Sequence, residues 1–409
     1  MRVQLFTGKG GVGKTTLAAA TAAQLAAEGR KVLVVSTDPA HSLADVLGVE
    51  LGADPIEVDG SCGLFAAQVD TRRLLDGTWS SLREHLGVVL AGAGVDEVAA
   101  EELTVLPGVE ELLAMAEVHD AARTGPWEVV LVDCAPTAET LRLLSLPEAA
   151  AGYLERLFPA HQRMLGGVFG GARAALDRWQ QAADALSRLA ERLDRLRAML
   201  TDHDTTSVRL VLTPERVVVA EVRRTLTALA LLGIRVDALV VNRLVPAPHP
   251  RAQGPSAAWL RARRAEQDAV LGQLRADAGA LPVHTVGHRA AEPVGLVALG
   301  ELGAELGVGP DDGGGRAAGD GRAGGLLSVR RTAGSGRALD SEFELLVSLP
   351  AASPVELARV GDELAITVDG RRRLLSLPSV LRRCMVVGAE QHAGGLTVRF
   401  HPDPDVWLR

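Results

Sequence analysis

A glycine-rich stretch near the start of the chain, GKGGVGKTT at residues 8–16, has the residue types and the spacing that bind phosphate. It fits the pattern G-x-x-x-x-G-K-[ST], follows an apolar run and opens a helical pattern. The glycines would let backbone N–H groups curl around phosphate oxygens, and the helix N-terminus would add its partial positive charge. The stretch therefore predicts a nucleotide-binding loop made of Gly8, Gly10, Gly11, Val12, Gly13, Lys14, Thr15 and Thr16.

Three side chains would each have a separate role in the chemistry at that loop. Lys14 would reach the β- and γ-phosphates, and Thr15 would supply an oxygen to Mg²⁺. Asp133 ends another apolar run, in the position of a Walker-B aspartate, and would hold Mg²⁺ through water. The alternative for Asp133 is an ordinary aspartate that caps a loop.

Lys9 is a second lysine inside the same loop, one residue after Gly8. The form K-G-G-x-G-K-[ST] resembles the deviant P-loop of the nitrogenase iron protein, the division-site and plasmid-partition ATPases and the arsenite-pump ATPases. The resemblance implies a homodimer in which Lys9 reaches the partner's nucleotide and acts as an arginine finger does. The alternative for Lys9 is a solvated loop lysine.

Three further stretches narrow the resemblance. STDPAHSLADVLG (36–48) resembles switch I of the arsenite-pump and tail-anchored-protein-targeting ATPases, and VDCAPTAETLRLLSLPE (132–148) resembles their switch II. NRLVP (242–246) is similar to their adenine-contacting segment. The resemblance covers nearly all of residues 1–305, and the tail is similar to the small heat-shock (α-crystallin-like) domain appended to some bacterial members.

The resemblance implies roles for further residues. Asp38 would orient and polarise the attacking water, a task that hydrolytic phosphoryl transfer must assign. Asn242 and Pro246 would contact adenine, although Asn242 is also a common turn residue. His41 lies in the switch I stretch, where a capping role is as compatible as a catalytic one. The family's usual switch II sequence T-G-H-T is replaced here by TAET at residues 137–140, which predicts a changed coupling between nucleotide and client.

Alternating strands and helices would carry these residues. Several apolar runs are continuous, as expected for strands covered on both faces of a parallel sheet. Alanine-rich helical stretches separate them, the first closed by Gly29. This alternation predicts a doubly wound α/β domain with a mostly parallel sheet over residues 1–308. The runs are residues 2–6, 31–37, 127–133, 208–213, 237–243 and 282–287.

A helical insertion interrupts the alternation at about residues 148–204. Its apolar residues recur at three- and four-residue steps, which predicts an amphipathic helix with a wide apolar stripe. The stripe would pack on its own domain or, alternatively, form an apolar surface for a client. It consists of Leu176, Trp179, Leu186, Leu189, Leu193, Leu196 and Leu200.

The last hundred residues change character. Residues 309–337 are rich in glycine and predict a flexible linker. Beyond it the apolar period becomes two, as in Phe343, Leu345 and Val347, and Asp369-Gly370 gives a hairpin signal. Residues 338–409 therefore predict a small all-β sandwich.

Composition sets limits on the function. A net charge of −8 and a pI of about 5.7 give no support for nucleic-acid binding. Cys62, Cys134 and Cys384 are far apart and form no C-x-x-C pair, so we expect no intrachain zinc or metalloid site. With no leader and no apolar run of about 20 residues, the sequence predicts a cytoplasmic protein.

Three functions compete. The first is a dimeric Mg²⁺-ATPase whose nucleotide state controls an apolar surface for a hydrophobic or membrane-protein client, with a membrane partner left open. The second is a positional or partition ATPase. The third is an ATP-regulated holdase in which the β-sandwich does the main work, and deletion of residues 309–409 would separate it from the first. A metalloid transport subunit is disfavoured because the thiols do not converge.

Overall fold

The computed structural model describes residues 1–38, 42–59, 63–70, 109–134, 188, 191–307, 327–334, 339–347, 355–368, 371–392, 395–404 and 406–407. The chain divides into two compact units. The first comprises Met1–Thr206 and Ala291–Pro310, and the second comprises Ser207–Ala290 and Asp311–Arg409.

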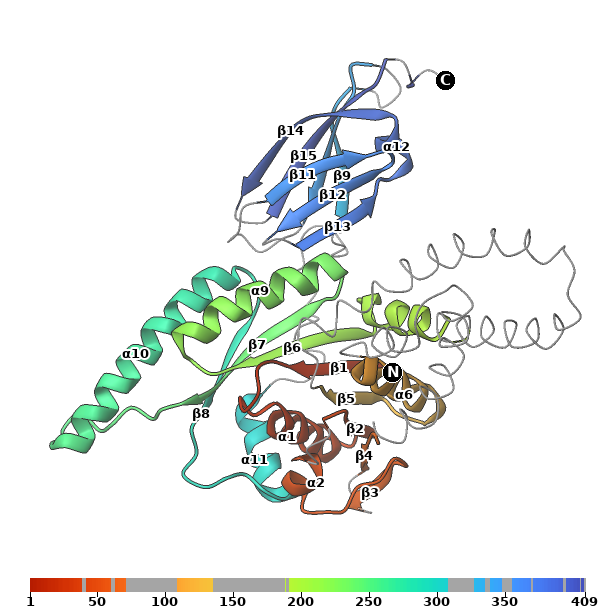
Figure 1. Cartoon of the computed structure of the whole chain (residues 1–409). Helices are drawn as coiled ribbons and strands as arrows, with labels where there is room; N and C mark the ends of the chain where they lie inside the picture. The colour runs from red at the N-terminus through yellow and green to blue at the C-terminus, as the bar shows by residue number, and fades with distance from the viewer. Residues whose placement is uncertain are drawn as a thin grey trace, which may run out of the picture. The chain divides into compact units, whose positions relative to one another are not determined.

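Five strands form the sheet of the first unit (Figure 1). They lie in the order β3-β4-β2-β5-β1, and only the pairing of β3 with β4 is antiparallel. β2 and β5 are buried at every position, as their continuous apolar runs predict. The strands are β1 (Arg2–Thr7), β2 (Val32–Ser36), β3 (Ile56–Asp59), β4 (Leu64–Gln68) and β5 (Val129–Asp133).

Helices α1 (Lys14–Ala27), α2 (Ser42–Leu47), α6 (Val109–Thr124) and α11 (Leu296–Leu306) belong to the same unit. α11 lies beside α1, although more than 260 residues separate them in the sequence (Figure 1). Gly303 makes this close approach, because a Cβ there would overlap the Ala20 carbonyl oxygen and lie 2.7 Å from Gln24 Cβ. α1 thus packs against a helix from the C-terminal end of the α/β domain that the sequence predicts over residues 1–308.

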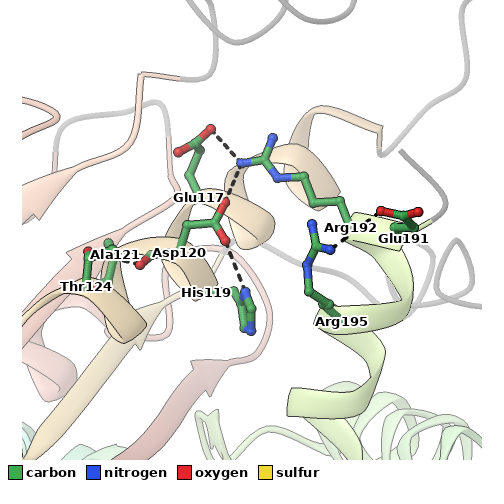
Figure 2. A network of polar contacts seen from close by, with 8 residues as sticks. All are labelled: Glu117, His119, Asp120, Ala121, Thr124, Glu191, Arg192 and Arg195. Carbon is green, nitrogen blue, oxygen red and sulfur yellow. Dashed lines mark hydrogen bonds and ion pairs between the residues drawn. The ribbon is translucent and has the colours of Figure 1, made fainter. Parts of the chain in front are cut away.

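A cluster of charged side chains joins α6 to the helical residues 191–201 (Figure 2). Arg192 donates hydrogen bonds to Glu117 (2.7 Å) and to Asp120 (3.0 Å), and only 19% of its side chain is exposed. Asp120 also lies 3.3 Å from the ring of His119. The arginine therefore binds two carboxylates that are one helical turn apart on α6.

The predicted insertion at 148–204 lies outside the described residues except for 188 and 191–204. The described part of its apolar stripe, Leu193, Leu196 and Leu200, is buried at 8%, 0% and 1% exposure. These three residues are buried, as expected if this end of the stripe forms part of a core and not an exposed surface. The rest of the stripe lies outside the described residues.

Three parallel strands and two helices form the α/β part of the second unit. The strands β6 (Thr206–Leu212), β7 (Val236–Leu244) and β8 (Val283–Gly287) lie in that order, with α9 (Arg216–Leu232) and α10 (Pro255–Ala278) between them in sequence. Apolar residues of these strands and helices share one core. Beside it Arg209 and Asp237 form a buried ion pair at 3.1 Å.

The C-terminal residues form two antiparallel sheets around a core that includes Phe343, Leu364 and Phe400 (Figure 1). The sheet orders are β14-β15-β10-β9 and β11-β12-β13. The elements are β9 (Leu327–Ala333), β10 (Glu342–Val347), β11 (Val355–Val360), β12 (Glu363–Val368), β13 (Arg371–Ser376), α12 (Ser379–Arg382), β14 (Cys384–His392) and β15 (Gly395–Pro402). The predicted fold classes, mostly parallel α/β and C-terminal all-β, are confirmed.

The prediction of a flexible linker over residues 309–337 is wrong for β9. Residues 327–333 form a strand that pairs antiparallel with β10, where Leu327 faces Val347 and Val329 faces Leu345. The short alternating run LSVRRTA directly follows a glycine-rich segment. The glycine content of that segment led to the prediction of a linker that includes this run. Pairing with β10 therefore determines the conformation of residues 327–333, in spite of the glycine-rich segment before them.

Candidate active site

The loop between β1 and α1 has the backbone that its glycines allow. Gly11 and Gly13 have φ values of 77° and 93°, in the left-handed region that favours glycine. A Cβ on Gly10 or Gly11 would meet no atom within 4 Å, so these residues border open space. α1 begins at Lys14 directly after Gly13, and backbone donors of its first turn are available to an anion there.

The two lysines of the loop differ in their surroundings. Lys14 is partly buried, and its Nζ donates a hydrogen bond to the Lys9 carbonyl oxygen at 3.2 Å. The side chain of Lys9 is exposed. Lys14 thus lies over its own loop, where a phosphate oxygen could replace the carbonyl, whereas Lys9 is on the surface.

Asp133, at the end of β5, is fully buried between β1 and β2. Its Oδ2 accepts hydrogen bonds from Thr15 Oγ1 (2.7 Å) and from Ser36 Oγ (3.2 Å). Its Oδ1 is buried and has no hydrogen-bond partner among the described residues. The structure therefore brings together Lys14, Thr15 and Asp133 as the sequence predicted.

These groups fit a Mg²⁺ ion. A carboxylate and a threonine hydroxyl offer the oxygen ligands that Mg²⁺ prefers, and such sites keep several waters. The Oδ1 of Asp133 is a buried acceptor that such a water or the ion would satisfy. Thr15 and Asp133 are the residues that would hold the ion.

Burial raises the pKa of Asp133 above the ordinary value of 3.8. The hydrogen bond from Thr15 and the charge of Lys14 act in the opposite direction, as does the hydrogen bond from Ser36. The negative charge of Asp38 adds to the rise in the pKa of Asp133. A cation at this place would relieve that repulsion.

Asp38 follows β2 and is fixed through its backbone. Its N–H donates to Ser36 Oγ at 3.2 Å, and its carbonyl oxygen accepts from Gln68 Nε2 at 2.6 Å. Ser36 and Gln68 are register partners at the ends of the parallel strands β2 and β4. Both are buried, at 0% and 3% exposure.

Sequence reasoning missed Ser36 and Gln68 as candidates. Gln68 is a single polar residue at the end of an apolar run and belongs to no motif, and Ser36 opens the switch I stretch of residues 36–48, where no role was expected of it. The available signal was that both are polar where a buried strand ends, at the carboxyl edge of a parallel sheet, where ligands bind in such folds.

Asn242 and Pro246 lie in the second unit, and their role toward adenine stays a prediction. Asn242 is partly buried, Pro246 is exposed, and Arg243 between them adopts a left-handed φ of 60°. Gln267 of α10 accepts from the Val245 N–H at 2.8 Å and donates to the Arg243 carbonyl at 3.3 Å. The segment is thus held by α10, which sequence reasoning also missed.

Several predicted residues lie outside the described ones. These are His41, Cys62 and the switch II residues 135–148. Of the other cysteines, Cys134 is fully buried against Met115 Sδ (3.7 Å), and burial raises its pKa well above the ordinary value. Burial also raises the pKa of Cys384 to about 11.

The part of the chain that the structure describes lacks two further features. No group of three or more His, Cys, Asp or Glu side chains there could hold a metal ion. None of the helices within that part has the length and hydropathy needed to cross a bilayer.

Comparisons with known proteins identify related chains. Residues 1–307 match the model of the ArsA ATPase family, described as an anion-transporting ATPase, and residues 340–400 match the HSP20-like domain found in ArsA. Protein Rv2184c of Mycobacterium tuberculosis is 41% identical and aligns with 99% of this chain and 97% of its own length. A Chlorobaculum tepidum protein named putative arsenical pump-driving ATPase is 31% identical over 92% of this chain and 90% of its own length. The ATPase get3 of Aspergillus terreus is 34% identical over 58% of this chain and 72% of its own length. The resemblance predicted from the motifs is confirmed.

Proposed function

The chain belongs to the ArsA ATPase family, and on that premise we propose that it hydrolyses MgATP as a homodimer and couples this reaction to a hydrophobic or membrane-protein client. The observation that carries the proposal is the arrangement at the start of α1. There a glycine loop, Lys14, Thr15 and the buried carboxylate of Asp133 meet at the carboxyl edge of the sheet. This is the set of groups that phosphoryl transfer from ATP requires.

Each residue of the loop then has a task. Backbone N–H groups from Gly8 to Thr16 bind the phosphates, and Lys14 exchanges the Lys9 carbonyl for a phosphate oxygen. When bound at Thr15 and Asp133, Mg²⁺ supplies positive charge that neutralises the phosphate oxygens. Asp38 orients the attacking water and accepts its proton.

The remaining assignments follow the same premise. Lys9, exposed on the loop, reaches the nucleotide of the partner subunit. Asn242 and Pro246 contact adenine. The ATPase domain spans residues 1–308, and a β-domain of the HSP20-like type follows.

Client handling rests on the relatives named ATPase GET3 and on the family's HSP20-like domain. In the proposal the client is captured by the helical insertion, whose apolar stripe continues N-terminally from the buried Leu193. The proposed place of action is the cytoplasm, with no nucleic-acid partner.

The decisive experiment separates binding from hydrolysis. Asp38→Asn should keep ATP binding and lower kcat by roughly 10²-fold or more, because water activation is lost while the phosphate loop is intact. Lys14→Ala should weaken ATP binding itself. Binding is measured by titration with a fluorescent ATP analogue and turnover by phosphate release.

Asp54→Asn is the matched control, since it makes the same change at an exposed aspartate in a loop. It should keep the wild-type kcat. An Asp38→Asn chain with wild-type turnover would refute the role of Asp38, and a wild-type chain that neither binds nor hydrolyses ATP would refute the proposed function.

A further inference from the structure

Asp38 is the proposed catalytic carboxylate, yet no motif explains what fixes its position. The residue follows β2 and lies where the described chain is interrupted until Ser42. Both of its peptide groups are bound by side chains, one from the end of β2 itself and one from the neighbouring strand β4. Ser36 accepts from its N–H on one side, and Gln68 donates to its carbonyl oxygen on the other.

We propose that Ser36 and Gln68 are positioning residues that hold the backbone of Asp38 for catalysis, and we refer to these two residues as the switch I latch. The proposal rests on the proposed ATPase function and adds to it two residues that act through the backbone of Asp38.

Gln68 is itself rigidly placed. Its backbone N–H donates to the Gly52 carbonyl oxygen at 2.8 Å, and the following residue, Val69, donates to the Ser36 carbonyl oxygen at 2.9 Å. The residue is 3% exposed, and its amide group reaches the Asp38 carbonyl over 2.6 Å. A short hydrogen bond from a buried, immobilised donor constrains its acceptor strongly.

Stability alone does not account for a glutamine at this place. Its Oε1 is buried without a hydrogen-bond partner among the described residues. The net contribution of one hydrogen bond to stability is generally smaller than the cost of one buried unpaired polar atom. The hydrogen bond to the Asp38 carbonyl oxygen is the one that the described residues show for this amide, which is consistent with a role in fixing Asp38.

Ser36 links the latch to the metal-binding carboxylate. The same hydroxyl that accepts from the Asp38 N–H donates to Asp133 Oδ2 at 3.2 Å. The position of the Asp38 backbone relative to Asp133 is thus set through one atom, the Oγ of Ser36. An error of about 1 Å in the placement of a catalytic group can lower a rate by about 10²-fold. The hydrogen bonds that place Asp38 should therefore affect the rate of hydrolysis.

The test uses Gln68→Met in the full-length chain. Methionine has nearly the same length but no N–H donor, so kcat should fall by about 10-fold or more while the Kd for MgATP changes by less than about 2-fold. Gln4→Met is the matched control, because Gln4 is also a fully buried glutamine on a strand of this unit. It should keep the wild-type kcat.

A double variant distinguishes positioning from a general loss of structure. In the Asp38→Asn background, Gln68→Met should cause no further loss of kcat, because no catalytic carboxylate is left to position. A loss of equal size in both backgrounds would overturn the proposal, as would an unchanged kcat in Gln68→Met. If Gln68→Met does not fold, Gln68→Asn serves instead, since its amide ends one methylene too short to reach Asp38.

Hydrogen exchange in the nucleotide-free chain tests the latch without the reaction. The peptide that contains Ser36 to Asp38 should exchange faster by about 10-fold in Gln68→Met than in wild type or Gln4→Met. Equal exchange in all three chains would overturn the proposal. An inactive wild-type chain would refute the ATPase function, and the exchange result would still decide the latch.

Discussion

Asp133 combines two features that conflict in the absence of nucleotide. It is fully buried beside Asp38, and its Oδ1 lacks a partner among the described residues. Burial raises its pKa, so ionised Asp133 costs the folded chain free energy. In the proposed function the same carboxylate holds Mg²⁺. A residue proposed to be needed for function therefore lowers the stability of the folded chain.

Asp133→Asn should therefore stabilise the nucleotide-free chain at neutral pH while it lowers Mg²⁺-dependent hydrolysis. A raised carboxyl pKa contributes stability that is present below the ordinary value of 3.8 and is lost as pH rises through the folded-state value. Asparagine keeps an acceptor oxygen for Thr15 and Ser36 and removes the charge. We expect Tm to increase by about 2–4 °C at pH 7.

The gain in Tm should shrink as the pH is lowered toward the ordinary aspartate pKa, because wild-type Asp133 is then protonated and also neutral. Thermal melts of both chains from neutral to acidic pH measure this difference. A Tm of the variant below that of wild type at pH 7 would contradict the prediction.

At the residue scale, the sequence predicted the groups that a spaced motif marks. Lys14 and Thr15 are adjacent in the phosphate-binding pattern, and the structure places both beside Asp133 as expected. Ser36 and Gln68 could not be found in this way. Gln68 contacts a residue 30 positions away, and that contact exists only because β4 lies next to β2 in the folded sheet.

At the scale of helices, the contact of α11 with α1 depends on one glycine. Gly303→Ala should destabilise the fold by about 1–3 kcal/mol, because the added methyl group would overlap the Ala20 carbonyl oxygen. Gly300→Ala is the matched control on the same helix, since its Cβ would meet no atom within 4 Å. That variant should be neutral or stabilise by up to about 1 kcal/mol.

Urea unfolding of both variants, compared with wild type, measures this difference. Equal midpoints for Gly303→Ala and Gly300→Ala would show that α1 and α11 can move apart without cost, against the prediction.

The charged cluster of Figure 2 allows a second comparison, between two arginines on the helical residues 191–201. Arg192→Met should lower the free energy of unfolding by about 1–2 kcal/mol, because a mostly buried guanidinium loses two carboxylate partners. Arg195→Met should change it by less than about 0.5 kcal/mol, since its pair with Glu191 spans 3.9 Å between exposed side chains.

Chemical denaturation of the nucleotide-free chain tests this pair of variants. If Arg195→Met proved as costly as Arg192→Met, the loss would come from the helix itself and not from its attachment to α6.

Elements were predictable where hydrophobicity was continuous. The runs that became β1, β2 and β5 are buried on both faces, so their apolar pattern needs no context. β3 and β4 were missed because their pairing, and not a continuous apolar run, defines them. β9 was misread because a glycine-rich segment precedes it and its pairing with β10 is not visible in the sequence.

For the molecule as a whole, the proposed homodimer makes a prediction about shared sites. If Lys9 acts on the partner's nucleotide, Lys9→Ala and Asp38→Asn homodimers should each bind ATP and hydrolyse it poorly. In a mixed dimer the Lys9→Ala subunit keeps Asp38 and receives Lys9 from its partner. One site of two is then complete.

Phosphate release by isolated heterodimers should recover to about half the wild-type rate if the sites act independently. Mixing each variant with itself is the control and should give no recovery. A verified heterodimer without any recovery would place the action of Lys9 within its own subunit or exclude it.

The contact between α1 and α11 also has a consequence during synthesis. Leu296 follows Ala27 by 296 − 27 = 269 positions, so the helix that carries the phosphate loop leaves the ribosome long before the helix that covers it. At about 5–20 residues per second, this interval lasts roughly 15–50 s. Through that time the face of α1 at Ala20 and Gln24 is without its native cover on the nascent chain.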